Sequence, residues 1–211
     1  LRHGADCHVH NGLDWNAYGP VDLALKKDYF HFLGKAAWRV KNVQGAIDTC
    51  RLAQAPLLVL GGHRLNIKRG FRWTWSRSVE FAGMVGGQKK LDGLRGSRGL
   101  VFPVRWHEPF GLAVIESLYF GAPVFATPYG ALPEIVSPDC GTLSSSAHEL
   151  AQAMQQQTFD RAACHHRAVS HFSAERMTAD YLDIYQRVLS GEILNQTTPR
   201  MTSAADHLAW H

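Results

Sequence analysis

The sequence contains little cysteine, and the cysteines it has are scattered. Four occur among 211 residues, Cys7, Cys50, Cys140 and Cys164. None forms a Cys-x-x-Cys pair, and their spacings fit no zinc-ligand pattern. Isolated cysteines in a chain of this size are typical of a reducing compartment. A disulfide-stapled domain and a zinc ribbon are therefore disfavoured, and we expect a cytoplasmic location.

Long apolar runs and long basic runs are also absent. No hydrophobic stretch approaches the ~20 residues of a membrane-spanning helix, and the N-terminus lacks the features of a signal peptide. The net charge is +4, which fits ordinary solubility or a local basic cleft for an anion. Without a Lys/Arg run we expect no nucleic-acid partner. A membrane surface remains open as a partner, although no sequence feature indicates one.

Histidine is frequent, but no metal-ligand pattern accompanies it. The chain has 12 His residues, and the close pairs are His8 with His10 and His165 with His166. No acid or cysteine stands at ligand spacing beside either pair, so we expect surface or packing histidines and no metal site. The chain begins with Leu, which suggests a piece of a longer protein.

Short apolar runs alternate with helical patterns along most of the chain. Hydrophobic residues make up 45% of the sequence. Apolar runs predict buried strands at 29–34, 57–62, 79–83, 100–104, 123–127 and 141–143. Helical periodicity separates several of them, as in 43–54. This alternation predicts an α/β fold, a Rossmann-like open parallel sheet of about six strands with helices on both faces.

The domain plan follows from the same patterns. Residues 1–28 are rich in turns and predict a hinge or linker, and 29–172 hold the Rossmann-like domain. Residues 173–190 predict one long helix whose apolar stripe we expect to pack. Residues 191–211 are polar and predict a weakly ordered tail. A dinucleotide-binding dehydrogenase is disfavoured, because "FLGKAAWR" stands where Gly-x-Gly-x-x-Gly should follow the first strand.

Two carboxylates flank a strand-to-helix turn in "HEPFGLAVIE". Glu108 and Glu116 have seven residues between them, and Pro109 and Gly111 suit the turn. Free backbone N–H groups at such a helix start favour an anion, and a carboxylate accepts two hydroxyl hydrogen bonds. From the spacing alone we would favour a simpler explanation, in which one Glu stands at a helix start and Glu116 lies on the surface.

The wider pattern resembles a known family. "EPFGLAVIE" is similar to the E-x7-E signature of the retaining glycosyltransferases of family four, which have the GT-B fold. Further segments resemble the same family: "HNGLD", "FHFLGKAAWRVKN", "LLVLGG", "VEFAGMVGGQKKLDGL", "PVRWHEPFGLAVIESLYFGAPVFATPYGALPEIV" and "FSAERMTADYLDIYQRVL". Together they extend from about residue 11 to 189, which makes chance agreement a poor explanation.

The resemblance implies a role for particular residues. Glu116 would bind the ribose hydroxyls of a nucleotide sugar, and Glu108 would meet the donor sugar. Lys35 and Lys41 would neutralise the diphosphate, with Lys35 at a position where the family commonly has Arg. Backbone groups would contact the rest of the donor, at Gly34, Pro109, Phe110, Gly111 and Leu112. The segment "VEFAGMVGGQKKLDGL" would form a loop that meets the nucleobase through Met84 and Val85. Arg105, Trp106 and His107 precede the signature and fit the cleft wall or ordinary packing equally well.

The resemblance also implies what lies outside these residues. The chain corresponds to the C-terminal, donor-binding half of a GT-B enzyme, so a missing N-terminal domain would bind the acceptor, which stays unknown. No Asp-x-Asp pair is present to hold a metal beside the nucleotide, so we expect a metal-independent hexosyltransferase without a cofactor and favour a UDP-sugar as donor. The alternatives are a nucleotide-sugar epimerase of GT-B fold and a non-catalytic nucleotide-sugar-binding module.

Overall fold

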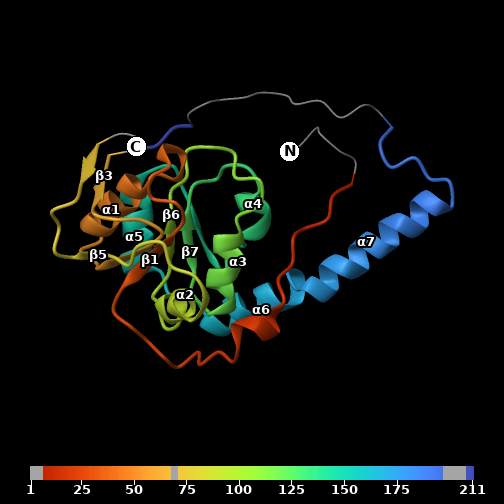
Figure 1. Ribbon diagram of the computed structural model, residues 1–211, viewed down its shortest axis with the longest axis horizontal. Helices are drawn as coiled ribbons and strands as arrows, with labels where there is room; N and C mark the ends of the chain where they lie inside the picture. The colour runs from red at the N-terminus through yellow and green to blue at the C-terminus, as the bar shows by residue number, and fades with distance from the viewer. Residues whose placement is uncertain (1–6, 68–70, 197–207) are drawn as a thin grey trace.

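The computed structural model describes residues 7–67, 71–196 and 208–211. Figure 1 shows a central sheet with helices on either side and one long helix that projects from this body. The main sheet contains β1 (Phe30–Leu33), β2 (Leu57–Leu60), β5 (Val79–Phe81), β6 (Leu100–Phe102), β7 (Val124–Ala126) and β8 (Gly141–Leu143). These six strands match the six apolar runs of the sequence. The predicted α/β fold with an open parallel sheet is confirmed.

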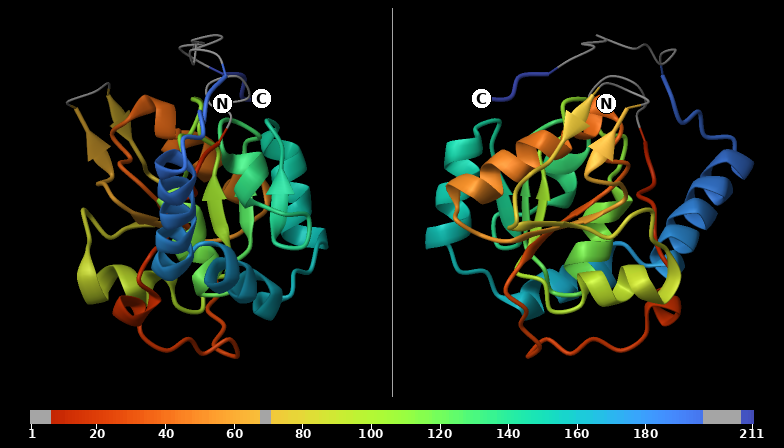
Figure 2. Two further views of the ribbon diagram at one scale, coloured as in Figure 1. Left: turned by 90° about the vertical axis from the view of Figure 1, so that its right-hand side faces the viewer. Right: turned by 60° about the vertical axis from the view of Figure 1, so that its left-hand side comes forward.

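The strand order explains where a ligand can bind. The order across the sheet is β5-β2-β1-β6-β7-β8, and every neighbouring pair is parallel. The chain moves outward from β1 in one direction and then returns to β6 on its other side. This reversal is the switch point at which open α/β sheets hold their ligands, outside the carboxyl ends of the strands. The arrowheads in Figure 2 point to this end of the molecule.

Helices cover both faces of the sheet because each presents an apolar side to it. One face carries α1 (Val43–Leu52) and α5 (Ala147–Gln156), and the other carries α2 (Gly87–Leu94), α3 (Leu112–Tyr119) and α6 (Arg161–His171). The short α4 (Leu132–Ile135) adds Leu132 and Ile135 to the second face. Side chains cap the first turns of α1, α5 and α6, from Asn42, Ser146 and Asp160, which satisfies backbone donors that a helix start leaves free.

Part of the predicted linker belongs to the core. The 3-10 helix η1 (Trp15–Tyr18) places Trp15 flat against Tyr119, with ring centroids 4.4 Å apart. The backbone N–H of Leu13 donates to the carbonyl of Phe172, and Ala174 donates back to Leu13. These contacts attach the N-terminal segment to the second face of the sheet and to the start of the last helix.

The crossover between β2 and β5 differs from the predicted pattern. It contains a small antiparallel hairpin, β3 (Leu65–Asn66) and β4 (Arg72–Trp73), in which Leu65 lies opposite Trp73. Parallel strands are usually joined through a helix. After β5, residues expected to form a loop at the nucleobase instead begin α2 at Gly87.

The last helix, α7 (Ala174–Leu189), forms as predicted but does not pack as predicted. None of its residues is buried, and Tyr181, Tyr185 and Val188 of the expected stripe are exposed. The prediction of a packed stripe is wrong for the described chain, because α7 projects away from the domain (Figure 1).

The predicted tail falls partly on residues 197–207, outside the described residues. Residues 208–211 lie against the domain. The N–H of Ala147 donates to the carbonyl of His211, and the Tyr129 hydroxyl donates to the carbonyl of Ala209.

Candidate functional site

The carboxyl ends of β1 and β6 bring two predicted residues together at the switch point. Lys41 ends the 3-10 helix η2 (Arg39–Lys41) after β1, and Glu108 follows β6. Lys41 Nζ lies 2.6 Å from Glu108 Oε2. Both side chains are largely shielded from solvent. A shielded ion pair of this kind holds both groups in place while each keeps capacity for a further partner.

Trp106 completes this cluster. Its indole Nε1 donates to the same Glu108 oxygen at 2.9 Å, and Lys41 Nζ lies 4.8 Å from the centre of its ring. Trp106 also packs, half-buried, against the core of the domain, which supports ordinary packing, one of the two interpretations that the sequence left open. Lys41 and Trp106 both contact Oε2, and among the described residues no hydrogen bond is made to Oε1 of Glu108.

The loop that carries Glu108 depends on two glycines. Gly130 runs so close to Glu108 that a Cβ would lie 2.2 Å from the Glu108 carbonyl oxygen. Gly111 has φ 97° and precedes the first residue of α3, a backbone conformation that other residues adopt only with strain. Within the described chain no side chain caps α3. Its first amides are therefore available as donors for an anion.

Glu116 is buried one turn further into α3 and has two partners. Lys90 Nζ of α2 lies 2.5 Å from Glu116 Oε1, and the Tyr18 hydroxyl donates to the same oxygen at 2.5 Å. Burial, together with this bond to Glu116, raises the pKa of Tyr18, so Tyr18 stays a hydrogen-bond donor. Oε2 has no hydrogen-bond partner among the described residues.

Lys35 lies apart from the Lys41–Glu108 pair. It is exposed, and its Nζ stands 4.9 Å from the centre of the Trp38 ring. It lines a cavity of about 180 Å³ at the ends of β1, β2 and β5, with Gly61, Gly62, His63 and Met84. Lys35 thus lines the same cavity as Met84, whereas Lys41 forms an ion pair with Glu108.

The other predicted donor residues surround these clusters. Gly34 lies close to the end of β2, since a Cβ added to Gly61 would lie 2.1 Å from the Gly34 carbonyl oxygen. Phe110 is buried, whereas Pro109 and Leu112 are exposed at the start of α3. Val85 packs, half-buried, against the core.

Sequence reasoning missed Lys90 and Tyr18. Lys90 stands in "GGQKKLDGL", part of the expected loop at the nucleobase, and Tyr18 stands in the expected linker. A helix over 87–94 would have placed one lysine of this segment beside α3, where Glu116 lies, so helical periodicity was the signal that could have found it. The contact of Tyr18 joins residues 98 positions apart and has no local signature.

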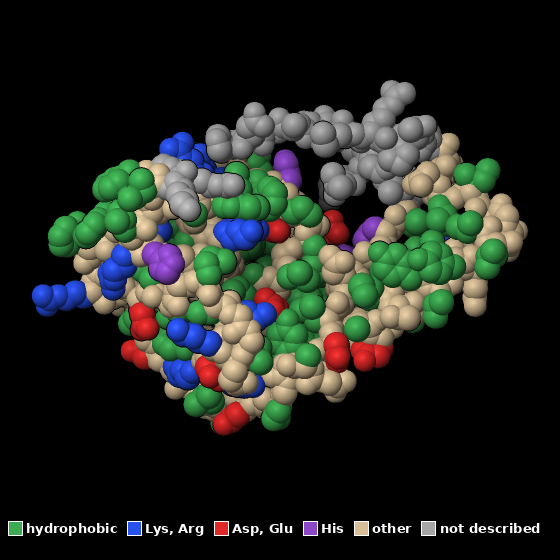
Figure 3. Space-filling model, viewed as in Figure 1, with side chains coloured by type: hydrophobic (Ala, Val, Ile, Leu, Met, Phe, Trp, Pro, Cys, Tyr) green, Lys and Arg blue, Asp and Glu red, His purple; other side chains and the backbone are tan. Residues whose placement is uncertain are grey.

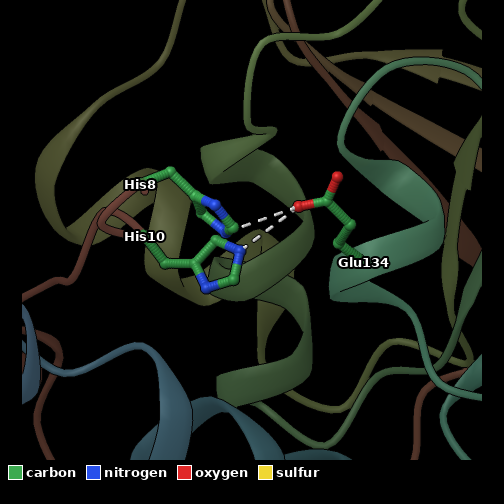
Figure 4. A group of neighbouring side chains, drawn as sticks. All are labelled: His8, His10 and Glu134. Atoms are coloured by element: carbon green, nitrogen blue, oxygen red, sulfur yellow. Dashed lines mark ion pairs between the residues drawn. The ribbon is translucent and has the colours of Figure 1, made fainter. Parts of the chain in front are cut away.

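One further group of polar side chains lies beside α4. His8 and His10 face Glu134, with Nε2–Oε2 distances of 3.9 Å and 3.5 Å (Figure 4). The fold brings Glu134 beside this histidine pair, although no acid stands at ligand spacing from it in the sequence. One ligand atom from each residue lies within 4.8 Å of the others, so these three could hold a metal ion.

No helix of the described chain is long and apolar enough to cross a membrane.

Comparison with known proteins agrees with this geometry. Residues 27–158 match the family described as glycosyl transferases group 1. A GDP-mannose-dependent alpha-(1-6)-phosphatidylinositol dimannoside mannosyltransferase of Mycobacterium tuberculosis is 28% identical over 147 residues, which cover 67% of this chain and 39% of that protein. The chain therefore spans less than half the length of this curated relative.

Solved structures show the same fold. AviGT4, a glycosyltransferase involved in avilamycin A biosynthesis, superposes with a TM-score of 0.75 at 22% identity, over 91% of this chain and 61% of AviGT4. Anabaena HepE in complex with UDP-glucose superposes with a TM-score of 0.65 at 19% identity, over 86% of this chain and 57% of HepE. With the family match extending over the sheet and both acidic residues of the cleft, this chain belongs to the group 1 glycosyltransferases.

Proposed function

We propose that this chain is the donor-binding domain of a retaining hexosyltransferase that takes its sugar from a nucleoside diphosphate. The observation that carries the proposal is the arrangement at the switch point. Lys41 and Glu108 are paired there at 2.6 Å, beside the uncapped start of α3, and Glu116 is held further along the same helix. A cation, a row of backbone donors and two carboxylates suit a phosphate group with hydroxyls on either side of it.

Glu116 is the proposed ribose ligand. Lys90 and Tyr18 hold its Oε1 from two sides, which fixes the carboxylate without occupying Oε2. A carboxylate oxygen can accept two hydroxyl hydrogen bonds, and the two hydroxyls of a ribose meet that requirement. Lys90 and Tyr18 are therefore proposed as positioning residues.

Lys41 and the α3 amides are the proposed diphosphate site, with Lys35 as a second cation. When the bond from the anomeric carbon to the diphosphate breaks, the diphosphate leaves with the electron pair. Donors aimed at that growing charge stabilise the transition state. Lysines and helix amides can do this without a metal, so the proposed reaction is metal-independent.

Glu108 is proposed to position the sugar. Its Oε1 stays available for a sugar hydroxyl while Lys41 and Trp106 hold Oε2. In a front-face reaction the acceptor oxygen bonds the anomeric carbon on the side that the diphosphate leaves, and the acceptor proton passes to a phosphate oxygen. The configuration is retained without a covalent bond to Glu108.

The proposals for the donor nucleotide, the cellular compartment and the acceptor domain depend on weaker observations. A UDP-sugar is the proposed donor, supported by HepE, which was solved with UDP-glucose; the mycobacterial relative makes GDP-mannose the competitor to test. The four cysteines are free, in keeping with a cytoplasmic reaction. The acceptor would be held by an N-terminal domain, as the partial coverage of the relatives suggests.

Calorimetry tests the division of roles. UDP, UDP-glucose and GDP-mannose are titrated into the chain with and without a chelator, and binding should survive the chelator. Glu116→Gln should weaken the binding of free UDP by about 1–3 kcal/mol, the cost of leaving buried polar partners unpaired. Glu108→Gln should leave free UDP as tight as before and weaken only the sugar-bearing donor, because Lys41 keeps its charge.

Glu175→Gln is the matched control, since Glu175 lies on the exposed first turn of α7. Equal loss of free UDP in both cleft variants would contradict the assigned roles. Loss of all binding with the chelator would contradict the metal-independent site.

A further inference from the structure

The β3–β4 hairpin exposes an unusual number of large apolar side chains. Ile67 is 70% exposed, Phe71 78% and Trp75 83%, and Leu65 and Trp73 are exposed as well. Figure 3 shows hydrophobic side chains gathered at the left of the molecule, where the hairpin lies, next to Lys and Arg side chains. Scattered apolar residues on a surface need no explanation, but a contiguous apolar patch marks a binding surface.

Exposed apolar and buried polar residues alternate through β4 and the residues that flank it, which also indicates a binding surface. Phe71, Trp73 and Trp75 are exposed, whereas Thr74 between them is buried and Arg72 is half-buried. A hairpin with one side in water normally keeps its polar residues outside. Here the order is reversed. The half-buried Arg72 is also held in place, because its guanidinium donates to the Thr74 hydroxyl and to the His63 carbonyl.

A cationic cavity lies between this hairpin and α1. Its volume is about 300 Å³, and Arg39, Arg72 and Arg105 line it together with Phe71. Among the described residues that line it there is no Asp or Glu. In the neighbouring cavity beneath Trp73 and Trp75, the carboxylate of Asp48 is already paired with Arg51. Three guanidinium groups with no acid among the described lining residues suit a phosphate, which Arg binds with two parallel hydrogen bonds.

The combination identifies the partner. Indole rings settle at the boundary between lipid and water, because one end is apolar and the other polar. Aliphatic side chains such as Ile67 and Leu65 gain from burial in acyl chains, and they offer no flat ring on which a nucleic-acid base could stack. Arginines beside such residues attract anionic lipid headgroups.

We propose that the β3–β4 hairpin is a docking site for an anionic membrane surface, with a headgroup phosphate in the arginine-lined cavity. Ile67, Phe71, Trp73 and Trp75 enter the interfacial layer, and Arg39, Arg72 and Arg105 contact the headgroup. The hairpin directly follows β2, and Asn66 and Arg72 line both this cavity and the one that holds Lys35 and Met84. Docking therefore brings the open end of the cleft close to the membrane.

Vesicle flotation tests the docking site. The chain is mixed with vesicles of phosphatidylcholine alone and with vesicles of equal parts phosphatidylcholine and phosphatidylglycerol. It should float with the anionic vesicles only, and added salt should reduce the bound fraction. Phe71→Ser and Trp75→Ser should each weaken binding about tenfold through lost apolar burial. Arg39→Gln should weaken binding to anionic vesicles by a smaller factor.

The controls use side chains that are as exposed as those of the hairpin. Leu189→Ser and Ile193→Ser change residues 86% and 80% exposed at the other end of the molecule, and both should float like the unaltered chain. Binding of UDP by the hairpin variants should be unchanged, which separates this proposal from the proposed function. Three results would overturn it: no flotation, equal flotation of the hairpin variants, or hairpin-dependent binding of a single-stranded oligonucleotide in place of vesicles.

Discussion

His31 shows how a single polar side chain can be held inside the sheet. It lies on β1, is fully buried, and both ring nitrogens are 2.8 Å from hydroxyl oxygens, Ser97 Oγ and Ser117 Oγ. With both nitrogens satisfied the neutral ring is stable there, but a charged ring would have no counterion. Burial accordingly lowers the pKa of His31 from 6.5 to about 3.

This residue should make stability depend on pH. Below pH 6.5 His31 is protonated in the unfolded chain, whereas in the folded chain it stays neutral down to about pH 3. Stability therefore falls as the pH falls through this window, by about 1.4 kcal/mol per pH unit and by about 2 kcal/mol at about pH 5. Urea unfolding at neutral pH and at about pH 5 measures the difference. His31→Gln should flatten it, and the exposed His166→Gln should not.

At this scale the sequence singled out three residues but not their contacts. Glu108 and Glu116 were predicted from the resemblance of one short signature, and Lys41 from the resemblance of "FHFLGKAAWRVKN". The partners of Glu116, Lys90 and Tyr18, come from other elements, and the Tyr18 contact depends on how η1 packs on Tyr119. Such contacts follow from tertiary packing, which a local pattern does not encode.

The loop–helix element that starts α3 depends on backbone conformation. Gly130 has φ 68°, and an added Cβ would lie 2.2 Å from the Glu108 carbonyl oxygen. Gly130→Ala should cost about 1–3 kcal/mol of stability through strain. It should also weaken the sugar-bearing donor, because the loop that carries Glu108 must move. Gly86→Ala is the control, since nothing lies within 4 Å of its added Cβ. Thermal unfolding and calorimetry that fail to separate the two variants would contradict this account.

Elements with a continuous apolar signal were predictable, and elements without one were not. All six strands of the main sheet coincide with apolar runs, and α3 begins where Gly111 predicted a helix start. The β3–β4 hairpin has only two residues in each strand and mixes charged with aromatic residues. Its apolar side chains face outward, so the usual rule that apolar residues face the core gives no guide to it.

On the scale of the whole molecule, α7 projects from the packed domain (Figure 1). It extends for 16 residues without a buried one, and Tyr181, Leu182 and Tyr185 are exposed along it. An amphipathic helix gains most of its stability from packing. We therefore expect α7 to rest against another domain in a longer protein, as the 61% coverage of AviGT4 suggests.

The chain alone should bind a donor but transfer no sugar. The Lys41–Glu108 cluster and Glu116 are held within the domain, so the donor half of the site should work by itself. The proposed acceptor site lies on another domain, and holding two reactants in line can supply ~7–11 kcal/mol of a barrier. Losing even half of that would slow turnover at least about 400-fold. The measurement is released diphosphate with a panel of acceptors, and donor binding by calorimetry is the control. Acceptor-dependent turnover by this chain would show that both halves of the site lie within it.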